Sequence, residues 1–304
     1  MPGAERADSN DRGRVLKRAK SALAVRARAA GVDLDHHLRC EQETALLLDT
    51  LSAEQREAVL SDLDEGAGNP REDLTSAVSS ALIAVNAFGA FIGRRHSDEL
   101  LKLTLSSPRF ERKYPVSGVR TWPERVPNLD VVQVDGDRAV AIESKLAEPW
   151  RGKPRFRLSS QYDEPAECFS AALREEMNAV RAAHYELFDA AQAVKHLLGL
   201  HSAVKRDPAK SGPRLPKQTT LVLLHWEPEH ATDEPLIGAL HDEAEAFRDR
   251  IAGGPIAVQL LSYPRLWRTW QAEGQPSWLR AHADALADRY QVGLGESVIG
   301  TGLQ

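Results

Sequence analysis

Apolar and polar positions alternate most regularly over residues 128–145, which read NLDVVQVDGDRAVAIESK. Two runs in this stretch, 131–134 and 139–142, are rich in β-branched and small apolar residues. Between them lies Asp135-Gly136, a dipeptide that tolerates positive φ and suits a type I′ two-residue turn. The pattern therefore predicts a β-hairpin.

The position of the turn decides which side chains share a face of this hairpin. If residues 135 and 136 form the turn, Asp130 pairs with Ala141. Opposed residues lie on one face and alternate residues return to it, so Asp130, Glu143 and Lys145 are expected to project from the same side. Asp130 and Glu143 are then diagonal neighbours with Cα atoms roughly 7–8 Å apart.

Periodic segments elsewhere predict an α/β fold with a mixed sheet. We expect helices over 36–51, 53–63, 71–92, 164–183, 185–200, 233–252, 264–270 and 278–290, and strands over 112–116, 219–226 and 256–262. The first 30 residues predict a basic helix or arm, which could contact nucleic acid or be a solvated helix face. Two glycines and a proline in residues 65–70 mark a boundary between an N-terminal helical extension (1–68) and a second domain (69–304).

Composition narrows the class of protein. The chain has 304 residues and 42% hydrophobic content, enough for a sizeable core. No apolar run reaches the roughly 18 residues that span a bilayer, and the N-terminus lacks the apolar core of a signal peptide, so we expect no membrane association and a cytoplasmic location. The net charge of −5 argues against binding nucleic acid by bulk charge, although local basic runs can still contact phosphates.

Two carboxylates and an ammonium group on one face suit metal-assisted hydrolysis of a phosphodiester. Carboxylate oxygens bind Mg²⁺, with Mn²⁺ as an alternative, and the cation makes bound water a better nucleophile. Asp130 and Glu143 are the predicted metal ligands, and the backbone carbonyl of Ser144 could add a further oxygen. Lys145 is predicted to orient the water or neutralise the phosphate.

Asp130 followed by Glu143-Ser144-Lys145 resembles the D…(D/E)xK signature of the PD-(D/E)xK nuclease superfamily. The segments AIESKLAEPW at 141–150 and SSALIAVNAFGAF at 79–91 resemble a bacterial family of putative restriction endonucleases within it, over roughly residues 70 to 292. The proline of the superfamily name does not precede Asp130 directly, since Pro127 lies three positions upstream.

This resemblance implies a restriction-endonuclease-like αβββαβ core and a Mg²⁺-dependent DNA endonuclease with a restriction or defence role. It also implies that Gln192, on the helix after the ExK strand, is a catalytic residue, and it allows a homodimer. We expect three basic loops, 109–125, 151–157 and 205–217, to line a cleft. The predicted DNA-binding residues of the middle loop are Arg151, Lys153, Arg155 and Arg157.

Other interpretations of the same residues stay open. Asp130 could begin an edge strand as a solvated residue, with Glu143 and Lys145 an ordinary surface pair. The protein could also be a non-catalytic nucleic-acid-binding protein that retains the nuclease fold, or a nuclease that acts on RNA with the same site.

Overall fold

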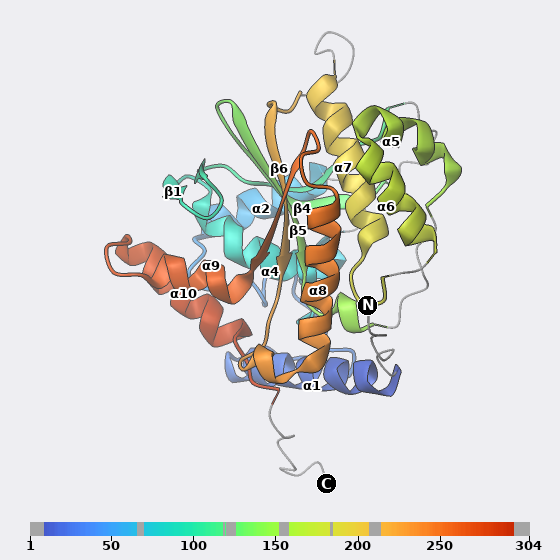
Figure 1. Cartoon of the computed structure of the whole chain (residues 1–304). Coiled ribbons are helices and arrows are strands. Elements are labelled where there is room, and N and C mark those ends of the chain that lie inside the picture. Colours follow the sequence, from blue (N-terminus) through green and yellow to red (C-terminus); the bar gives the residue numbers. More distant parts are fainter. Residues whose placement is uncertain are drawn as a thin grey trace.

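A five-stranded mixed sheet, in the order β3-β4-β5-β6-β7, forms the centre of the protein (Figure 1). This computed structural model describes residues 9–65, 70–117, 119, 126–151, 158–182, 185–206 and 214–294. The strands are β3 (Arg109–Lys113), β4 (Asn128–Asp135), β5 (Arg138–Lys145), β6 (Gln218–His225) and β7 (Ala257–Ser262). β3, β4 and β5 pair antiparallel, and β6 and β7 extend the sheet in parallel with β5. The predicted α/β class with a mixed sheet is confirmed.

Helices precede, interrupt and follow these strands. The described α-helices are α1 (Ser9–Ala29), α2 (Ala53–Glu65), α3 (Pro70–Leu74), α4 (Ser80–Phe88), α5 (Asp163–Phe169), α6 (Ala171–Arg181), α7 (Ala190–Lys205), α8 (Pro235–Arg250), α9 (Tyr263–Gln271) and α10 (Ser277–Tyr290). A small antiparallel sheet of β1 (His96–Asp98) and β2 (Leu103–Leu105) was not expected from the sequence. Among the described residues, no helix combines the length and apolar character that a membrane span requires.

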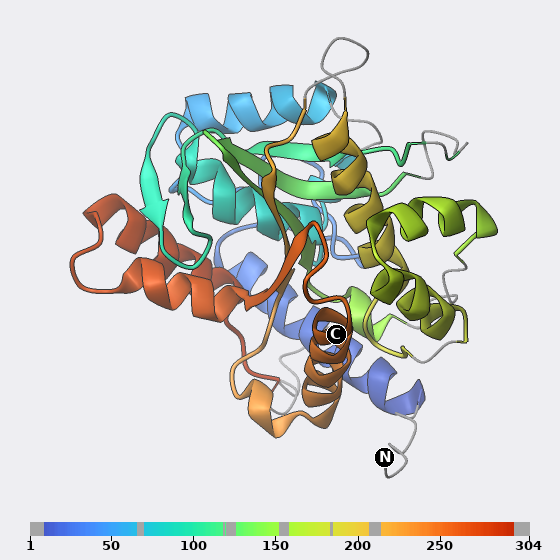
Figure 2. The same cartoon turned by 45° about the horizontal axis from the view of Figure 1, so that its top comes forward.

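Helices cover both faces of the sheet (Figure 2). Neighbouring residues of β5 point to opposite faces of the sheet, so their contacts show which helix lies on each face. The Ser144 hydroxyl donates to Ser80 O of α4 at 3.1 Å, whereas Glu143 contacts His196 of α7. Helix α4 therefore lies on one side of the sheet and α7 on the other.

The N-terminal helices share one hydrophobic core with the sheet. Val15 and Leu23 of α1 are fully buried in it. The buried Asn86 amide of α4 accepts from Leu48 N at 2.9 Å and donates to Tyr290 Oη of α10 at 2.7 Å, so it joins three distant segments. Residues 66–69, where the sequence suggests a domain boundary, lie outside the described residues, and the division at 68/69 stays a prediction.

The helix predicted over 36–51 is wrong. This segment is a series of turns, and three consecutive residues, Leu46, Leu47 and Leu48, are all buried. A helix would point such neighbours in different directions, whereas here the Asn86 side chain satisfies the backbone N–H of Leu48. The helix predicted over 53–63 is confirmed as α2, and Ser52 and Gln55 cap its start reciprocally.

The single helix predicted over 71–92 is broken into α3 and α4. Ala77 N donates to Leu38 O at 3.0 Å, and Cys40 N donates to Thr75 O at 2.9 Å. These bonds to the preceding segment replace helical ones. Ser79 then begins α4, because its side chain accepts from Leu82 N at 3.3 Å.

Two further helices and one strand differ from the prediction. The helix expected over 164–183 divides at Ser170, whose extended backbone ends α5 and whose hydroxyl caps α6. The helix expected over 185–200 begins at Ala190, because the Asp189 side chain caps it. The first strand of the sheet is β3 at 109–113, three residues earlier than the predicted 112–116.

We predict that the close approach of α7 to the loop after β3 limits residue 199 to glycine. A Cβ atom on Gly199 would lie 2.1 Å from Tyr114 O, whereas a Cβ on Gly238 of α8 meets no atom within 4 Å. Gly199→Ala should therefore lower the free energy of unfolding by about 1–3 kcal/mol. Gly238→Ala should raise it by about 0.5–1 kcal/mol, because alanine favours helices.

Urea denaturation followed by circular dichroism measures both changes. Equal free energies of unfolding for Gly199→Ala and the wild type would show that the loop moves aside without cost.

Candidate active site

The β4–β5 hairpin forms as predicted, but its register differs by two residues. Val132 pairs with Ala141, and Asp135 pairs with Arg138, so the turn is Gly136-Asp137. The predicted pairing of Asp130 with Ala141 is wrong. Gly136 has φ +59° and is the glycine that a type II′ turn needs at its first central position.

The two-residue shift preserves the predicted face. Side chains alternate with a period of two, so only a shift by one residue would have separated the carboxylates. The observed register continues to place Asp130 directly opposite Glu143, with Lys145 two residues further along the same face. The charged groups predicted to converge are therefore closer neighbours than the sequence suggested.

Glu143 is buried and has two nitrogen-bearing partners. Lys145 Nζ donates to Glu143 Oε1, and His196 Nε2 lies 2.9 Å from Glu143 Oε2 without hydrogen-bond geometry. Burial alone would raise the pKa of the Glu143 carboxyl, but Lys145 and His196 offset this and lower it to about 2. Burial acts to lower the pKa of Lys145, yet Glu143 raises it above its usual value, so the ammonium stays charged.

Helix α7 brings two side chains to this pair. Gln192 Oε1 accepts from Lys145 Nζ at 3.0 Å, so the structure places Gln192 beside the ExK strand, while its catalytic role stays a prediction. His196 was not predicted. Its spacing of four residues from Gln192 puts both on one face of a helix, and that spacing was the available signal.

Asp130 has a different environment from Glu143. Its Oδ2 accepts from Ser144 N at 2.7 Å, and burial followed by the charges of Glu143 and Glu111 raises its pKa well above the usual value. Ser144 itself turns its hydroxyl to the opposite face, where it contacts Tyr263 Oη at 2.8 Å. The backbone carbonyl of Ser144 as a metal ligand stays a prediction.

Glu111 of β3 is a further buried carboxylate that the sequence analysis missed. The pairs Phe110–Val131 and Arg112–Leu129 bracket it, so Glu111 lies opposite Asp130. Its side chain is 7% exposed, and burial raises its pKa to about 7 although Asn128 Nδ2 donates to Oε2 at 2.6 Å. No motif links β3 to the hairpin, so only the sheet pairing reveals this neighbour.

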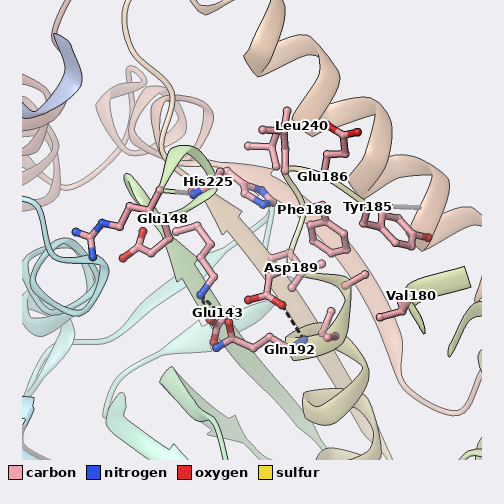
Figure 3. A pocket seen from close by; sticks show the side chains of 18 residues that line it. Glu143, Glu148, Val180, Tyr185, Glu186, Phe188, Asp189, Gln192, His225 and Leu240 are labelled. Carbon is pink, nitrogen blue, oxygen red and sulfur yellow. Dashed lines mark hydrogen bonds and ion pairs between the residues drawn. The ribbon is translucent and has the colours of Figure 1, made fainter. Parts of the chain in front are cut away.

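A cavity of about 100 Å³ is lined by Glu143, Lys145 and Gln192 of this site. Figure 3 shows Glu143 and Gln192 at one end of it, with Phe188 and Leu240 on the wall further along. His225 also lines it, and burial lowers the pKa of that imidazole to about 4, so it is neutral near pH 7. The candidate active site thus lies at an accessible hollow of the sheet face that α7 and α8 cover.

The predicted DNA-binding arginines are only partly described. Arg151 is exposed in the segment that follows β5 and lines the cavity, whereas Lys153, Arg155 and Arg157 lie outside the described residues. In the first basic loop, Arg109 and Arg112 both pair with Asp62 of α2. These two guanidinium groups are therefore engaged within the protein. The other arginines of that loop, Arg120 and Arg125, lie outside the described residues.

The donor set fits a hard cation. Glu143 Oε2 is buried and has no hydrogen-bond partner among the described residues, and carboxylates are the ligands that Mg²⁺ prefers. Within the described part of the chain, no group of three or more His, Cys, Asp or Glu side chains is gathered as a metal site. Mg²⁺ retains several waters and needs only one or two carboxylates, which Asp130 and Glu143 can supply.

The sequence of nearly the whole chain matches a known protein family. The family described as "Restriction Endonuclease associating with ARP" matches residues 14–291, which include the whole sheet and every candidate site residue. The chain belongs to this family. Membership indicates a nuclease or defence-related role and confirms the resemblance to a restriction endonuclease family; the wider PD-(D/E)xK superfamily stays a prediction. No curated protein and no solved structure matches the chain.

We predict that Glu111 makes this family member less stable as pH rises. Because its pKa is raised from 4.5 to about 7 in the folded protein, the native state binds more protons than the unfolded state between these values. Stability from this group is therefore lost as pH increases through that window. Glu111→Gln removes this titration. The free energy of unfolding of the variant, relative to that of the wild type, should therefore rise by about 1–3 kcal/mol as the pH is raised from 4.5 to 7.5.

Urea unfolding in EDTA across this pH range measures the difference. Parallel pH profiles for the wild type and Glu111→Gln would contradict the assignment of a raised pKa to this carboxyl.

Proposed function

We propose that this protein is a Mg²⁺-dependent endonuclease of the PD-(D/E)xK type that hydrolyses phosphodiester bonds of DNA in a restriction or defence role. The observation that carries the proposal is the contact set at one row of the sheet. Asp130 and Glu143 face each other on adjacent strands, and Lys145 bridges Glu143 to Gln192. This set occurs in a chain of a restriction endonuclease family.

The order of elements supports the same proposal. After α4 and the small β1–β2 sheet come three antiparallel strands, of which the third carries Glu143 and Lys145. Helices ending in α7 follow, and then the parallel strand β6. This order supports the proposal of the αβββαβ arrangement that the resemblance implies. Cutting of both DNA strands by a homodimer is part of the proposal.

Each side chain has a chemical task in this site. Asp130 and Glu143 would hold the cation, which supplies a more acidic bound water and offsets negative charge on the phosphate. Lys145 keeps its ammonium charge and can donate to the attacking water or to a phosphate oxygen. Gln192 and His196 limit the movement of Lys145 and Glu143 through contacts of 3.0 and 2.9 Å.

One test of this proposal concerns the chemical step. Glu143→Gln should bind DNA as well as the wild type, because the amide keeps the shape of the side chain and the hairpin register. Cleavage should fall on the order of 10³-fold, since a metal ligand worth several kcal/mol is lost. Binding is measured by fluorescence anisotropy in Ca²⁺, and cleavage is measured in Mg²⁺.

Chelation and a control variant complete this test. EDTA should abolish cleavage by the wild type and added Mg²⁺ should restore it, while Glu176→Gln, a buried carboxylate on α6, should cleave normally. Cleavage that persists in EDTA would contradict the proposal. DNA binding without any cleavage would favour the non-catalytic alternative, and selective cleavage of RNA would change the substrate.

Another test of this proposal concerns the basic segment after β5. Arg151→Ala should reduce the slope of log K against log salt by about 0.9, and adding Arg155→Ala and Arg157→Ala should reduce it further by a similar amount each. Arg174→Ala removes an exposed arginine that pairs with Glu167 and should leave the slope unchanged. A triple variant with the wild-type slope would mean that this segment does not contact phosphates.

A further inference from the structure

We propose that Glu111 is a third carboxylate of the metal site and shares a divalent cation with Asp130. This inference rests on the proposed function, because it assigns a further ligand to the same cation. It adds a residue from outside the hairpin, on a strand that carries no part of the ExK signature.

Sheet pairing places the three carboxylates in one row. Glu111 lies opposite Asp130 across β3 and β4, and Asp130 lies opposite Glu143 across β4 and β5. Neighbouring strands are about 4.8 Å apart, and a cation with bonds of about 2.1 Å to two oxygens spans a similar distance. The spacing of the row therefore suits a cation bound between adjacent strands.

Glu111 is oriented by its own surroundings. Its φ of +52° belongs to the left-handed region, which interrupts the regular ladder at this residue alone among those of β3. Asn128 Nδ2 donates to Oε2 at 2.6 Å, so one carboxylate oxygen is held at the row. The hydrogen bonds of the described residues engage only Oε2 of Glu111 and only Oδ2 of Asp130.

Charge is balanced at one end of the row and not at the other. Lys145 and His196 both contact Glu143. Among the described residues, no ion pair includes Asp130 or Glu111, although both are buried. A divalent cation between β3 and β4 would supply positive charge to both carboxylates.

An independent observation indicates that the row receives a ligand. Glu143 Oε2 is fully buried and makes no hydrogen bond among the described residues, although His196 Nε2 lies 2.9 Å away without hydrogen-bond geometry. This oxygen is therefore able to act as a ligand of a cation bound beside Asp130. Among the described residues, no three His, Cys, Asp or Glu side chains are gathered as a metal site, so binding of one cation by this row requires side-chain rotation.

Binding of Mn²⁺ to the full-length protein without DNA tests this proposal, with free Mn²⁺ measured by electron paramagnetic resonance. We expect Glu111→Gln to weaken Mn²⁺ binding at least about tenfold, as losses around metal sites do. Glu111→Asp keeps the carboxylate and should bind more tightly than Glu111→Gln. Glu176→Gln should bind as the wild type does, and Asp130→Asn should lose binding.

The outcomes separate this inference from the proposed function. If Asp130→Asn loses Mn²⁺ but Glu111→Gln binds it as the wild type does, Glu111 is not a ligand and the proposed nuclease stands. If the wild type neither binds Mn²⁺ nor cleaves DNA, the proposed function fails as well. Should Glu111→Gln not fold, as judged by circular dichroism, the folded Glu111→Asp variant decides. Weaker Mn²⁺ binding than that of the wild type supports a ligand at this position, because the shorter side chain shifts its carboxylate, and wild-type affinity overturns the inference.

Discussion

Pairing between β4 and β5 is the constraint on which the rest of the site depends. It sets Asp130 against Glu143, and the extended strand then returns Lys145 to the same face two residues later. The backbone N–H of Ser144 donates to Asp130, so the hairpin also orients the carboxylate that it positions. A change of one residue in this register would move Asp130 to the face that α4 covers.

Helix α7 completes the site with side chains from a distant part of the sequence. Its close contact with the loop after β3 depends on Gly199, whose missing Cβ makes room for Tyr114 O. On the same helix, within two turns before Gly199, Gln192 contacts Lys145 and His196 contacts Glu143. The distance of α7 from the sheet therefore decides whether the charges of the ExK strand are balanced.

Local patterns allowed the hairpin, α2 and the two parallel strands to be predicted, because each depends on turn, cap or alternation signals within a few residues. Even the wrong register left the face of Asp130 correct, since its error equals the period of a strand. The failures involve distant partners: Asn86 holds the turns before α2, and sheet pairing alone brings Glu111 to Asp130. No spacing in the sequence encodes contacts of that kind.

The carboxylate row is costly for a sheet whose neighbouring positions are apolar. Leu129, Val131 and Ile142 are 1% exposed or less, and a residue of that kind at position 111 or 130 would leave no buried charge to offset. Lys145 and His196 offset the charge at Glu143, but Asp130 and Glu111 receive only N–H groups from the described residues. The buried carboxylates of Asp130 and Glu111 therefore lower the stability of the protein. A divalent cation bound between them would restore the balance of charge, and the protein should be most stable when that cation is bound.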